Sequence, residues 1–401
     1  MRRDVLTLVT ITAAGACSLD WDALDPRGVE PAATVGAGPG SSTTGGGGNG
    51  GTHATGGAGG NLPTGPWFDP GLSRRRALTV EGVDETLKDF PVLVALDASR
   101  IDHEASAPDG SDLRFEADGE LLAHDIDHWD AEGISTVWVR LPRMTSGATF
   151  TMYYGGTATK APLAPSNTWS ANYVAVWHLD GDGADASENG LDGNPQGVSA
   201  VPGLVGLAYD FDLLDEGRVD IPSTTASANA FVTGGTVSAA VRARTLGDND
   251  RGRILDRSGS TTFAGGWGLS VTDTNFEALA FGHDYDMNFG YWLTPPETIA
   301  FDRWQHVAAT ANVTDQTVSL YIDGAAVMLN ILQSGMITPE IVESHMISIG
   351  SRPNGDNRSF DGLIDEVRLS SVARSAAWMA AEAAAARDEL ITYGDEEAGP
   401  P

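Results

Sequence analysis

The stretch "FDGLIDEVRLSSVARSAAW", residues 360–378, alternates in side-chain character before its pattern becomes helical. Leu363, Asp365, Val367 and Leu369 occupy one set of alternate positions. A period of two is typical of a strand that buries one face, so we expect a strand whose apolar face carries one carboxylate, Asp365. A buried charge is costly unless a cation or hydrogen-bond donors compensate it. This position therefore predicts either a metal site or a set of backbone N–H donors.

The same alternation recurs in short runs from Trp67 onward, separated by Gly, Pro, Asp and Asn. The runs are "FPVLVALD" (90–97), "STVWVRLP" (135–142), "ATFTMYYGG" (148–156), "TVSAAVRAR" (236–244) and "TVSLYIDGAAVML" (317–329). In the last run, Asp323-Gly324 separates two apolar segments, which is a strong hairpin signal. Strands at this spacing predict an all-β protein built of sandwiches.

One segment has a clear helical pattern, "SAAWMAAEAAAARDEL", residues 375–390. Its high alanine content favours a helix, and Gly394 lies beyond its end. We therefore expect a short C-terminal helix followed by a tail, together covering residues 373–401.

The N-terminus has the features of an export signal. A basic start is followed by "VLTLVTITAAGA", residues 5–16, which is apolar but too short to span a bilayer. The small residues before Cys17 resemble a bacterial lipobox, which implies a signal peptide at 1–16 and lipidation of Cys17. Plain secretion and an unprocessed cytoplasmic chain are the alternatives. Cys17 is the only cysteine, so no intrachain disulfide can form.

A glycine-rich segment follows the cysteine. Residues 32–66 contain no Asp, Glu, Lys or Arg and almost no large apolar side chain, so they cannot form a core. We expect residues 17–66 to be a lipid-anchored, disordered Gly/Ser/Thr linker that holds a folded body away from a membrane. No later segment is long and apolar enough for a transmembrane helix. The expected location is the outer membrane or the cell surface.

The charge balance limits the partners. The 401 residues include 24 Lys+Arg and 55 Asp+Glu, which gives a net charge of −31. Binding to nucleic acid or to an anionic membrane surface requires clustered cations, so we expect neither kind of binding. The expected contact with a membrane is through the lipid anchor alone. Acidic surfaces are compatible with divalent cations. We expect a monomer.

Several motifs together resemble a known pair of bacterial surface domains. Their order and spacing match the laminin-G-like, or concanavalin-A-like, jelly roll over residues 166–372. The matching stretches are "VWHLDGDGADASENG", "GLAYDF", "TVSAAVRAR", "RWQHVAATANV", "LYIDGAAV", "ISIGSRP" and "FDGLIDEVRLSSVARS". Residues 67–165 resemble the uncharacterised domain that often precedes this jelly roll, through "DFPVLVALD", "DGSDLRF", "HDIDHWD", "VWVRLP" and "MYYGG". The resemblance implies two β-sandwiches, and an association with adhesins and carbohydrate-binding proteins.

An acidic, glycine-rich loop is the candidate metal site. Five carboxylates lie within residues 180–192, a composition that suits calcium, although the spacing is not that of an EF-hand. The resemblance implies that Asp185 and Asp365 lie together near a bound calcium ion, and we include Asn189 as a further ligand. The alternatives are a solvated acidic turn, and backbone donors from that loop to Asp365.

Aromatic residues give a candidate ligand surface in "FGHDYDMNFGYW", residues 281–292. The residues concerned are Tyr285, Asp286, Asn288, Tyr291 and Trp292. Exposed rings stack on sugars, and acids and amides bind the hydroxyl groups. The alternative is a hairpin whose rings belong to the core.

The sequence does not favour catalysis. Concanavalin-A-like glycosidases carry their acids along one strand, in patterns such as Glu-x-Asp-x-x-Glu, and this chain has no such run. We therefore expect a non-enzymatic surface lipoprotein that binds a glycan or a surface protein. A structural lipoprotein without a small ligand, and an enzyme acting on polysaccharide, are the two alternatives.

Overall fold

The computed structural model describes residues 65–228, 230–258, 266–272, 277–285, 288–333, 345–353 and 358–399. They lie within the unit Thr55–Pro401. Almost all of their regular structure consists of antiparallel strands arranged in sandwiches, so the expected all-β fold class is confirmed. Cys17 and most of the glycine-rich segment lie outside the described residues.

The first sandwich consists of a five-stranded and a three-stranded sheet. In order across the five-stranded sheet, the strands are β24 (Ile391–Ala398), β1 (Leu72–Val80), β7 (Thr149–Gly156), β3 (Arg114–Ala117) and β4 (Glu120–Leu122). The three-stranded sheet contains β2 (Leu87–Leu96), β6 (Ser135–Met144) and β5 (His124–His128). Buried side chains from both sheets, among them Phe90, Val139 and Phe115, form one apolar core.

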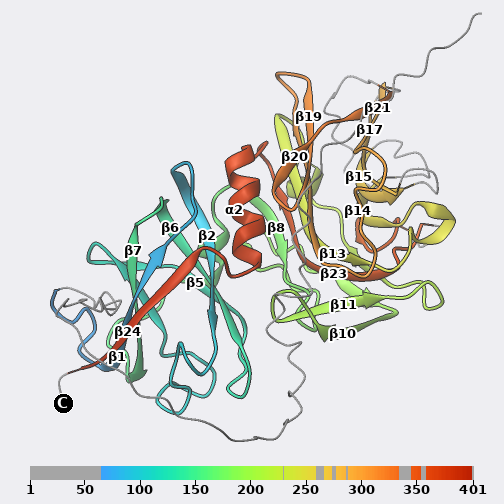
Figure 1. Ribbon diagram of the computed structural model, residues 1–401. Coiled ribbons are helices and arrows are strands. Elements are labelled where there is room, and N and C mark those ends of the chain that lie inside the picture. The colour runs from blue at the N-terminus through green and yellow to red at the C-terminus, as the bar shows by residue number, and fades with distance from the viewer. Residues whose placement is uncertain are drawn as a thin grey trace, which may run out of the picture. The chain divides into compact units, whose positions relative to one another are not determined.

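The C-terminal segment for which we expected a tail is instead strand β24. Its residues pair antiparallel with β1, from Val80 opposite Ile391 to Arg74 opposite Ala398. Figure 1 shows β24, in red, beside the blue β1, although the two strands stand at opposite ends of the chain. The Tyr393 hydroxyl also donates a hydrogen bond to the Ala95 carbonyl at 2.8 Å. The last strand of the chain therefore completes the first sandwich.

The jelly roll consists of two eight-stranded antiparallel sheets. In the first, the order is β10 (Val198–Pro202), β11 (Leu207–Phe211), β23 (Gly362–Ser370), β13 (Gly234–Ala243), β18 (Gln305–Asn312), β19 (Thr317–Ile322) and β20 (Ala325–Val327), and β8 (Tyr173–Trp177) also pairs with β23. In the second, the order is β21 (Asn330–Gln333), β17 (Asn288–Leu293), β16 (Ala278–Tyr285), β15 (Gly266–Thr272), β14 (Arg253–Arg257), β22 (Ile347–Ile349), β12 (Arg218–Ile221) and β9 (Asn194–Gln196). The side chains between these two sheets form the jelly-roll core.

The predicted alternation is confirmed in β13 and in the hairpin of β19 and β20. Val237, Ala239 and Val241 all lie in the jelly-roll core, as a period of two requires. At the turn, Asp323 has a φ of 50° and Gly324 has a φ of 77°. Positive φ at both central residues matches a two-residue hairpin turn, which explains why Asp-Gly stands here.

Strand β23 departs from the predicted alternation. A bulge shifts its register against β13 between Ala240, which lies opposite Asp365, and Ser238, which lies opposite Arg368. Glu366, at the bulge, has a φ of 50°. One extra residue reverses the alternation beyond it, so Val367 shares the core with Ile364 and not the face of Asp365. The prediction that Asp365 lies on the strand's apolar face is therefore wrong.

The chain has one longer helix, α2 (Ala376–Ala386), and a four-residue helix, α1 (Thr225–Ala228), within the described residues. Short 3-10 turns cover Pro165–Trp169 and Asp248–Asp250. The Ser375 hydroxyl caps α2 by accepting a hydrogen bond from the Trp378 backbone N–H at 3.2 Å. No helix in the described ranges has the length and apolar character needed to cross a bilayer.

Helix α2 contacts both sandwiches, β2 in the first and β20 in the jelly roll (Figure 1). Its buried residues, including Met379 and Ala385, belong to the same apolar cluster as the core of the first sandwich. That cluster also contains Ala308 and Tyr321 from the outer face of the jelly roll's first sheet. The helix and the first sandwich thus share continuous apolar contacts with the jelly roll.

A buried carboxylate, Glu382, anchors the helix. Its Oε1 accepts hydrogen bonds from Nε2 of His306, at 3.1 Å, and from the Ser238 hydroxyl. Its Oε2 lies 3.8 Å from Nη1 of Arg368. Burial alone raises the pKa of Glu382, but Arg368 and His306 outweigh it and lower the pKa from 4.5 to about 2. Glu382 is therefore ionised and paired at neutral pH.

Ending the chain after Leu390 removes β24 and exposes the pairing edge of β1. We expect the melting temperature to fall by several degrees and proteolysis of the first sandwich to speed up, because an apolar edge loses both its hydrogen bonds and its cover. Circular dichroism melts and limited proteolysis measure both effects. Ending the chain after Gly399 is the matched control. Equal melts for the two truncations would show that β24 contributes nothing.

Replacing Glu382 with Gln should flatten the dependence of stability on pH in acid. A lowered folded-state pKa stabilises the fold above about 4.5, and this stabilisation is lost as the pH falls toward 2. The shift from 4.5 to about 2 corresponds to about 3 kcal/mol. Urea unfolding at pH 7, 5 and 3 measures the change. Glu389→Gln, on the more exposed end of the same segment, is the control. Parallel curves for Glu382→Gln and the unmutated chain would contradict this assignment.

Candidate functional site

The bulge in β23 coincides with a gap in its pairing. One edge of β23 pairs with β13, and the other edge pairs with two shorter strands. Strand β11 pairs with Gly362–Ile364, and β8 pairs with Val367–Ser370. Asp365 and Glu366 lie between these two partners. Loops and side chains from elsewhere, rather than a neighbouring strand, therefore meet these two carboxylates.

Backbone donors reach one oxygen of the fully buried Asp365, whereas its Oδ1 has no hydrogen-bond partner among the described residues. Its Oδ2 accepts hydrogen bonds from the N–H groups of Leu204 and Val205, at 2.8 and 2.9 Å. Gly203 precedes them, and a Cβ at that position would lie 2.6 Å from the same oxygen, so glycine permits the close approach. Burial and the negative charge of Glu366 nevertheless raise the pKa of Asp365 well above its ordinary value. The donors come from the loop between β10 and β11, and not from the acidic loop that the sequence suggested.

The other two residues of the predicted calcium site hold the acidic loop together. Oδ1 of Asp185 accepts hydrogen bonds from the N–H groups of Val176 and Ser187, and its Oδ2 accepts one from that of Leu191. Asn189 donates to the carbonyl of Val174 at 3.0 Å. These contacts do not join Asp185 to Asp365. Calcium binding by Asp185, Asn189 and Asp365 stays a prediction.

The aromatic surface that we predicted is divided between core and undescribed residues. Trp292 is 6% exposed and packs in the jelly-roll core, as the alternative interpretation of the hairpin requires. The Tyr291 hydroxyl donates to Oγ1 of Thr272 at 3.2 Å. Tyr285 and Asn288 lie in β16 and β17, but their side chains are outside the described part, as is all of Asp286. Trp292 is therefore not available to stack on a sugar.

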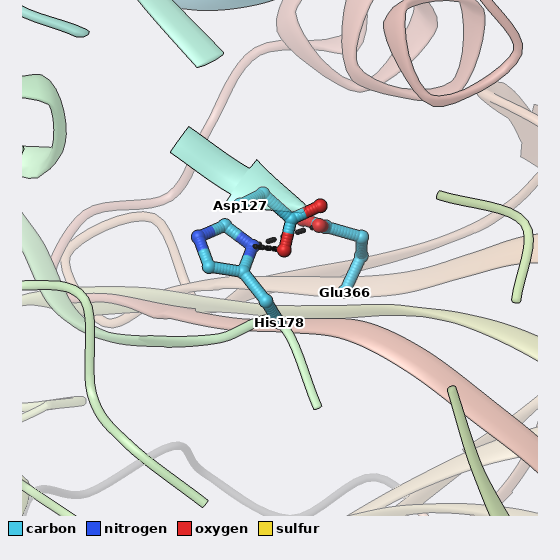
Figure 2. Close-up of side chains that lie close together, drawn as sticks. All are labelled: Asp127, His178 and Glu366. Carbon is cyan, nitrogen blue, oxygen red and sulfur yellow. Dashed lines mark hydrogen bonds and ion pairs between the residues drawn. The ribbon is translucent and has the colours of Figure 1, made fainter. Parts of the chain in front are cut away.

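A cluster that the sequence did not single out surrounds Glu366. Nδ1 of His178 lies 2.7 Å from Oε1 of Glu366 and 3.7 Å from Oδ1 of Asp127 (Figure 2). Within the described residues, these three side chains are the group whose ligand atoms are close enough to share a metal ion. The exposed fractions of the side chains are 1% for Asp127, 4% for Glu366 and 11% for His178.

Further polar groups hold each member of the cluster from outside. Nε2 of His178 faces Oδ2 of Asp125 at 3.4 Å, and the same oxygen accepts a hydrogen bond from Nε1 of Trp169 at 2.7 Å. Oδ2 of Asp127 accepts a hydrogen bond from the Thr136 hydroxyl at 2.8 Å. Oε2 of Glu366 accepts one from Arg368 at 2.7 Å. The orientation of the three side chains is thus determined by their neighbours.

The cluster strongly perturbs the acidity of its members. Burial acts to lower the pKa of His178, but Glu366, Asp127 and Asp125 outweigh it and raise the pKa well above 6.5. Burial raises the pKa of Asp127 to about 7. Glu366 keeps a lowered pKa despite its burial, because His178 and Arg368 stabilise its charge. The cluster therefore favours the charged imidazolium form of His178, next to the carboxylate of Glu366.

Sequence reasoning missed this cluster because its members are far apart in the chain. Glu366 lies 188 residues after His178, and Asp127 belongs to a different sandwich. The available signal was the alternation in "HDIDHW", where Asp125 and Asp127 share one face of β5. Two carboxylates on one face of a strand indicate a shared cationic partner, but not which residue supplies it.

An open groove crosses the outer face of the jelly roll's first sheet. It has a volume of about 350 Å³. Its lining residues are Val201, Pro202, Asp210, Arg242, Arg244, Asp302 and Leu363. Arg244 is committed to Asp210 and Asp361, at 2.7 and 2.9 Å, whereas Arg242 is exposed. The lining of the groove combines apolar side chains with charged ones.

Several solved structures resemble this chain at low similarity. The binding domain of Paraclostridial Mosquitocidal Protein 1 is 17% identical over 53% of this chain and 52% of its own, with a TM-score of 0.42. Domain 4 of AbnA, a GH43 extracellular arabinanase from Geobacillus stearothermophilus, solved with arabinotriose, is 17% identical over 52% of this chain and 97% of its own, with a TM-score of 0.36. The botulinum neurotoxin serotype C1 binding domain is 12% identical over 54% of this chain and 52% of its own, with a TM-score of 0.42. The chain thus spans about half the length of the two toxin domains, and likeness at this level carries no argument about function.

Two family models match parts of the chain. No curated protein matches it. Residues 109–172 match a domain of unknown function, DUF2341, and residues 215–380 match the concanavalin A-like lectin/glucanases superfamily. The first range contains β3 to β7 of the first sandwich, and the second runs from β12 into α2 and includes β23 and its bulge. The chain therefore contains a concanavalin A-like domain, preceded by a domain of the DUF2341 family.

Proposed function

We propose that this protein is a non-enzymatic binding module of an exported lipoprotein, and that its jelly roll binds a carbohydrate or another surface ligand. The observation that carries the proposal is the contrast between two sites. The clustered carboxylates Asp127, Asp365 and Glu366 are sealed from solvent, whereas the open groove presents Arg242 and Leu363.

The buried cluster is poorly placed for glycoside hydrolysis. That reaction needs an acid and a second carboxylate on either side of a sugar in a cleft. Asp365 is 0% exposed and Glu366 is 4% exposed, so a polysaccharide chain cannot reach them. In the groove, Asp210 is already paired with Arg244 at 2.7 Å. These features support a ligand-binding role and not hydrolysis.

The groove suits a ligand held by hydrogen bonds across several strands. Val201, Asp210, Leu363 and Arg242 come from β10, β11, β23 and β13, which are neighbours in the sheet. A guanidinium donates to hydroxyl oxygens, and the carboxylate of Asp302 accepts from hydroxyl groups. The aliphatic side chains cover the less polar part of a sugar ring.

Replacing Arg242 with Ala should weaken glycan binding about tenfold or more, because a hydrogen bond from a charged donor contributes about 1.5–3 kcal/mol. A glycan array with the purified chain, followed by calorimetry with the best ligand, measures this loss. Arg143→Ala, which removes an exposed arginine from β6, is the matched control.

Three other outcomes of the array would overturn parts of the proposal. Binding that survives Arg242→Ala places the ligand elsewhere. Silence across the array from a folded chain favours a structural lipoprotein without a small ligand. Release of sugar from a polysaccharide would establish an enzyme.

The lipid anchor is a separate part of the proposal and rests on the apolar run before Cys17. We expect the mature chain to begin at an acylated Cys17 and to sediment with membranes. Cys17→Ala should abolish the lipid modification and move the protein into the soluble fraction. Mass spectrometry of the N-terminus and membrane fractionation measure the two effects. A mature N-terminus at another residue, without lipid, would exclude the anchor.

A further inference from the structure

Three potential metal ligands converge at the bulge of β23. They are Nδ1 of His178, Oδ1 of Asp127 and Oε1 of Glu366, and all lie within 4.8 Å of one another. Asp127 comes from β5, His178 follows β8, and Glu366 lies in β23. Figure 2 shows the two carboxylates directed at the same nitrogen of the imidazole ring. Three separate segments therefore direct ligand atoms at one point.

One of these atoms has no hydrogen-bond partner within the described chain. Oδ1 of Asp127 is buried and accepts no hydrogen bond, whereas Oδ2 is held by Thr136. The nearest cationic atom is Nδ1 of His178, at 3.7 Å, which is too far for a hydrogen bond. A buried carboxylate oxygen without a donor is costly. This oxygen faces Nδ1 of His178 (Figure 2).

The outer partners resemble those of a metal-binding histidine. Such a histidine usually has its second ring nitrogen hydrogen-bonded to a carboxylate, which sets the orientation of the ring. Here Nε2 of His178 faces Asp125 at 3.4 Å, and Trp169 holds Asp125 in turn. Arg368 holds Oε2 of Glu366, and Oε1, which also accepts a hydrogen bond from Nε1 of Trp138 at 3.3 Å, faces the cluster. All three ligands are thus supported from outside.

We propose that Asp127, His178 and Glu366 bind a divalent transition metal, with zinc the best match to one imidazole and two carboxylates. The two carboxylates neutralise the dipositive ion, and the metal takes the place of the proton between His178 and Glu366. Two ligands at tetrahedral zinc are about 3.3 Å apart. Nδ1 of His178 lies 2.7 Å from Oε1 of Glu366 and 3.7 Å from Oδ1 of Asp127, so each of these two distances needs to change by less than about 1 Å.

The site is structural. Its side chains are buried and join the first sandwich to the jelly roll, which leaves no room for a polymeric substrate at the metal. Calcium is not the expected ion, because calcium prefers oxygen ligands and this group includes an imidazole nitrogen. The calcium prediction for Asp185, Asn189 and Asp365 concerns a different set of residues.

The experiment uses the full-length purified chain, stripped with a chelator and then titrated with zinc or cobalt. We expect about one equivalent of bound zinc by elemental analysis and a melting temperature several degrees higher. Cobalt should give the visible absorption of a tetrahedral site with nitrogen and oxygen ligands. The cobalt spectrum of the unmutated chain reports the ligands directly and does not depend on any variant folding.

Variants assign the ligands. Asp127→Asn should lose the bound metal and the rise in melting temperature, whereas Asp180→Asn, a nearby acid that pairs with His128, should keep both. Asp185→Asn should also keep the rise in melting temperature with zinc. If calcium raises the melting temperature of the unmutated chain but not that of Asp185→Asn, the acidic loop is a separate calcium site. The proposal is overturned if the unmutated chain binds no zinc, or if Asp127→Asn binds it as well as Asp180→Asn does.

Discussion

The packing of the jelly roll, the helix α2 and the first sandwich depends on the contacts of one buried guanidinium, that of Arg368. It is 2% exposed, donates to Glu366 at 2.7 Å and lies 3.8 Å from Glu382. Its Cζ atom lies over the ring of Trp138, 4.3 Å from the ring centre. A buried charge is tolerated only with well-placed partners, and here they come from β23, α2 and β6. The position of one cation thus constrains the jelly roll, the helix and the first sandwich together.

The bulge at Glu366 makes this arrangement compatible with a packed core. Without the extra residue, the alternation of β23 could not bury both Ile364 and Val367 in the core and still direct Asp365 and Arg368 outward. The positive φ of Glu366 is the local cost of that change. It is offset by the contacts of the Glu366 carboxylate with His178, Trp138 and Arg368.

The outer face of the jelly roll's first sheet has a covered part and an accessible part. Ala308 and Tyr321 lie in the apolar cluster shared with the helix and the first sandwich. Arg242 and Leu363 line the open groove. The accessible part is thus formed by β10, β11, β13 and the start of β23. The buried acids Asp365 and Glu366 are not among the residues that line the groove.

The sequence by itself determined the strands, because side-chain alternation and turn chemistry are local properties. Val237, Ala239 and Val241 face the core, and Asp323-Gly324 forms the hairpin turn. It also identified Asp365 as a carboxylate needing compensation. Only the tertiary structure decided which groups compensate it, since the bulge at Glu366 and the donors at Leu204 and Val205 depend on neighbouring segments. The same holds for β24 on β1 and for the meeting of Asp127, His178 and Glu366. Contacts between distant segments depend on how complete sheets pack, and periodicity within one segment carries no information about that.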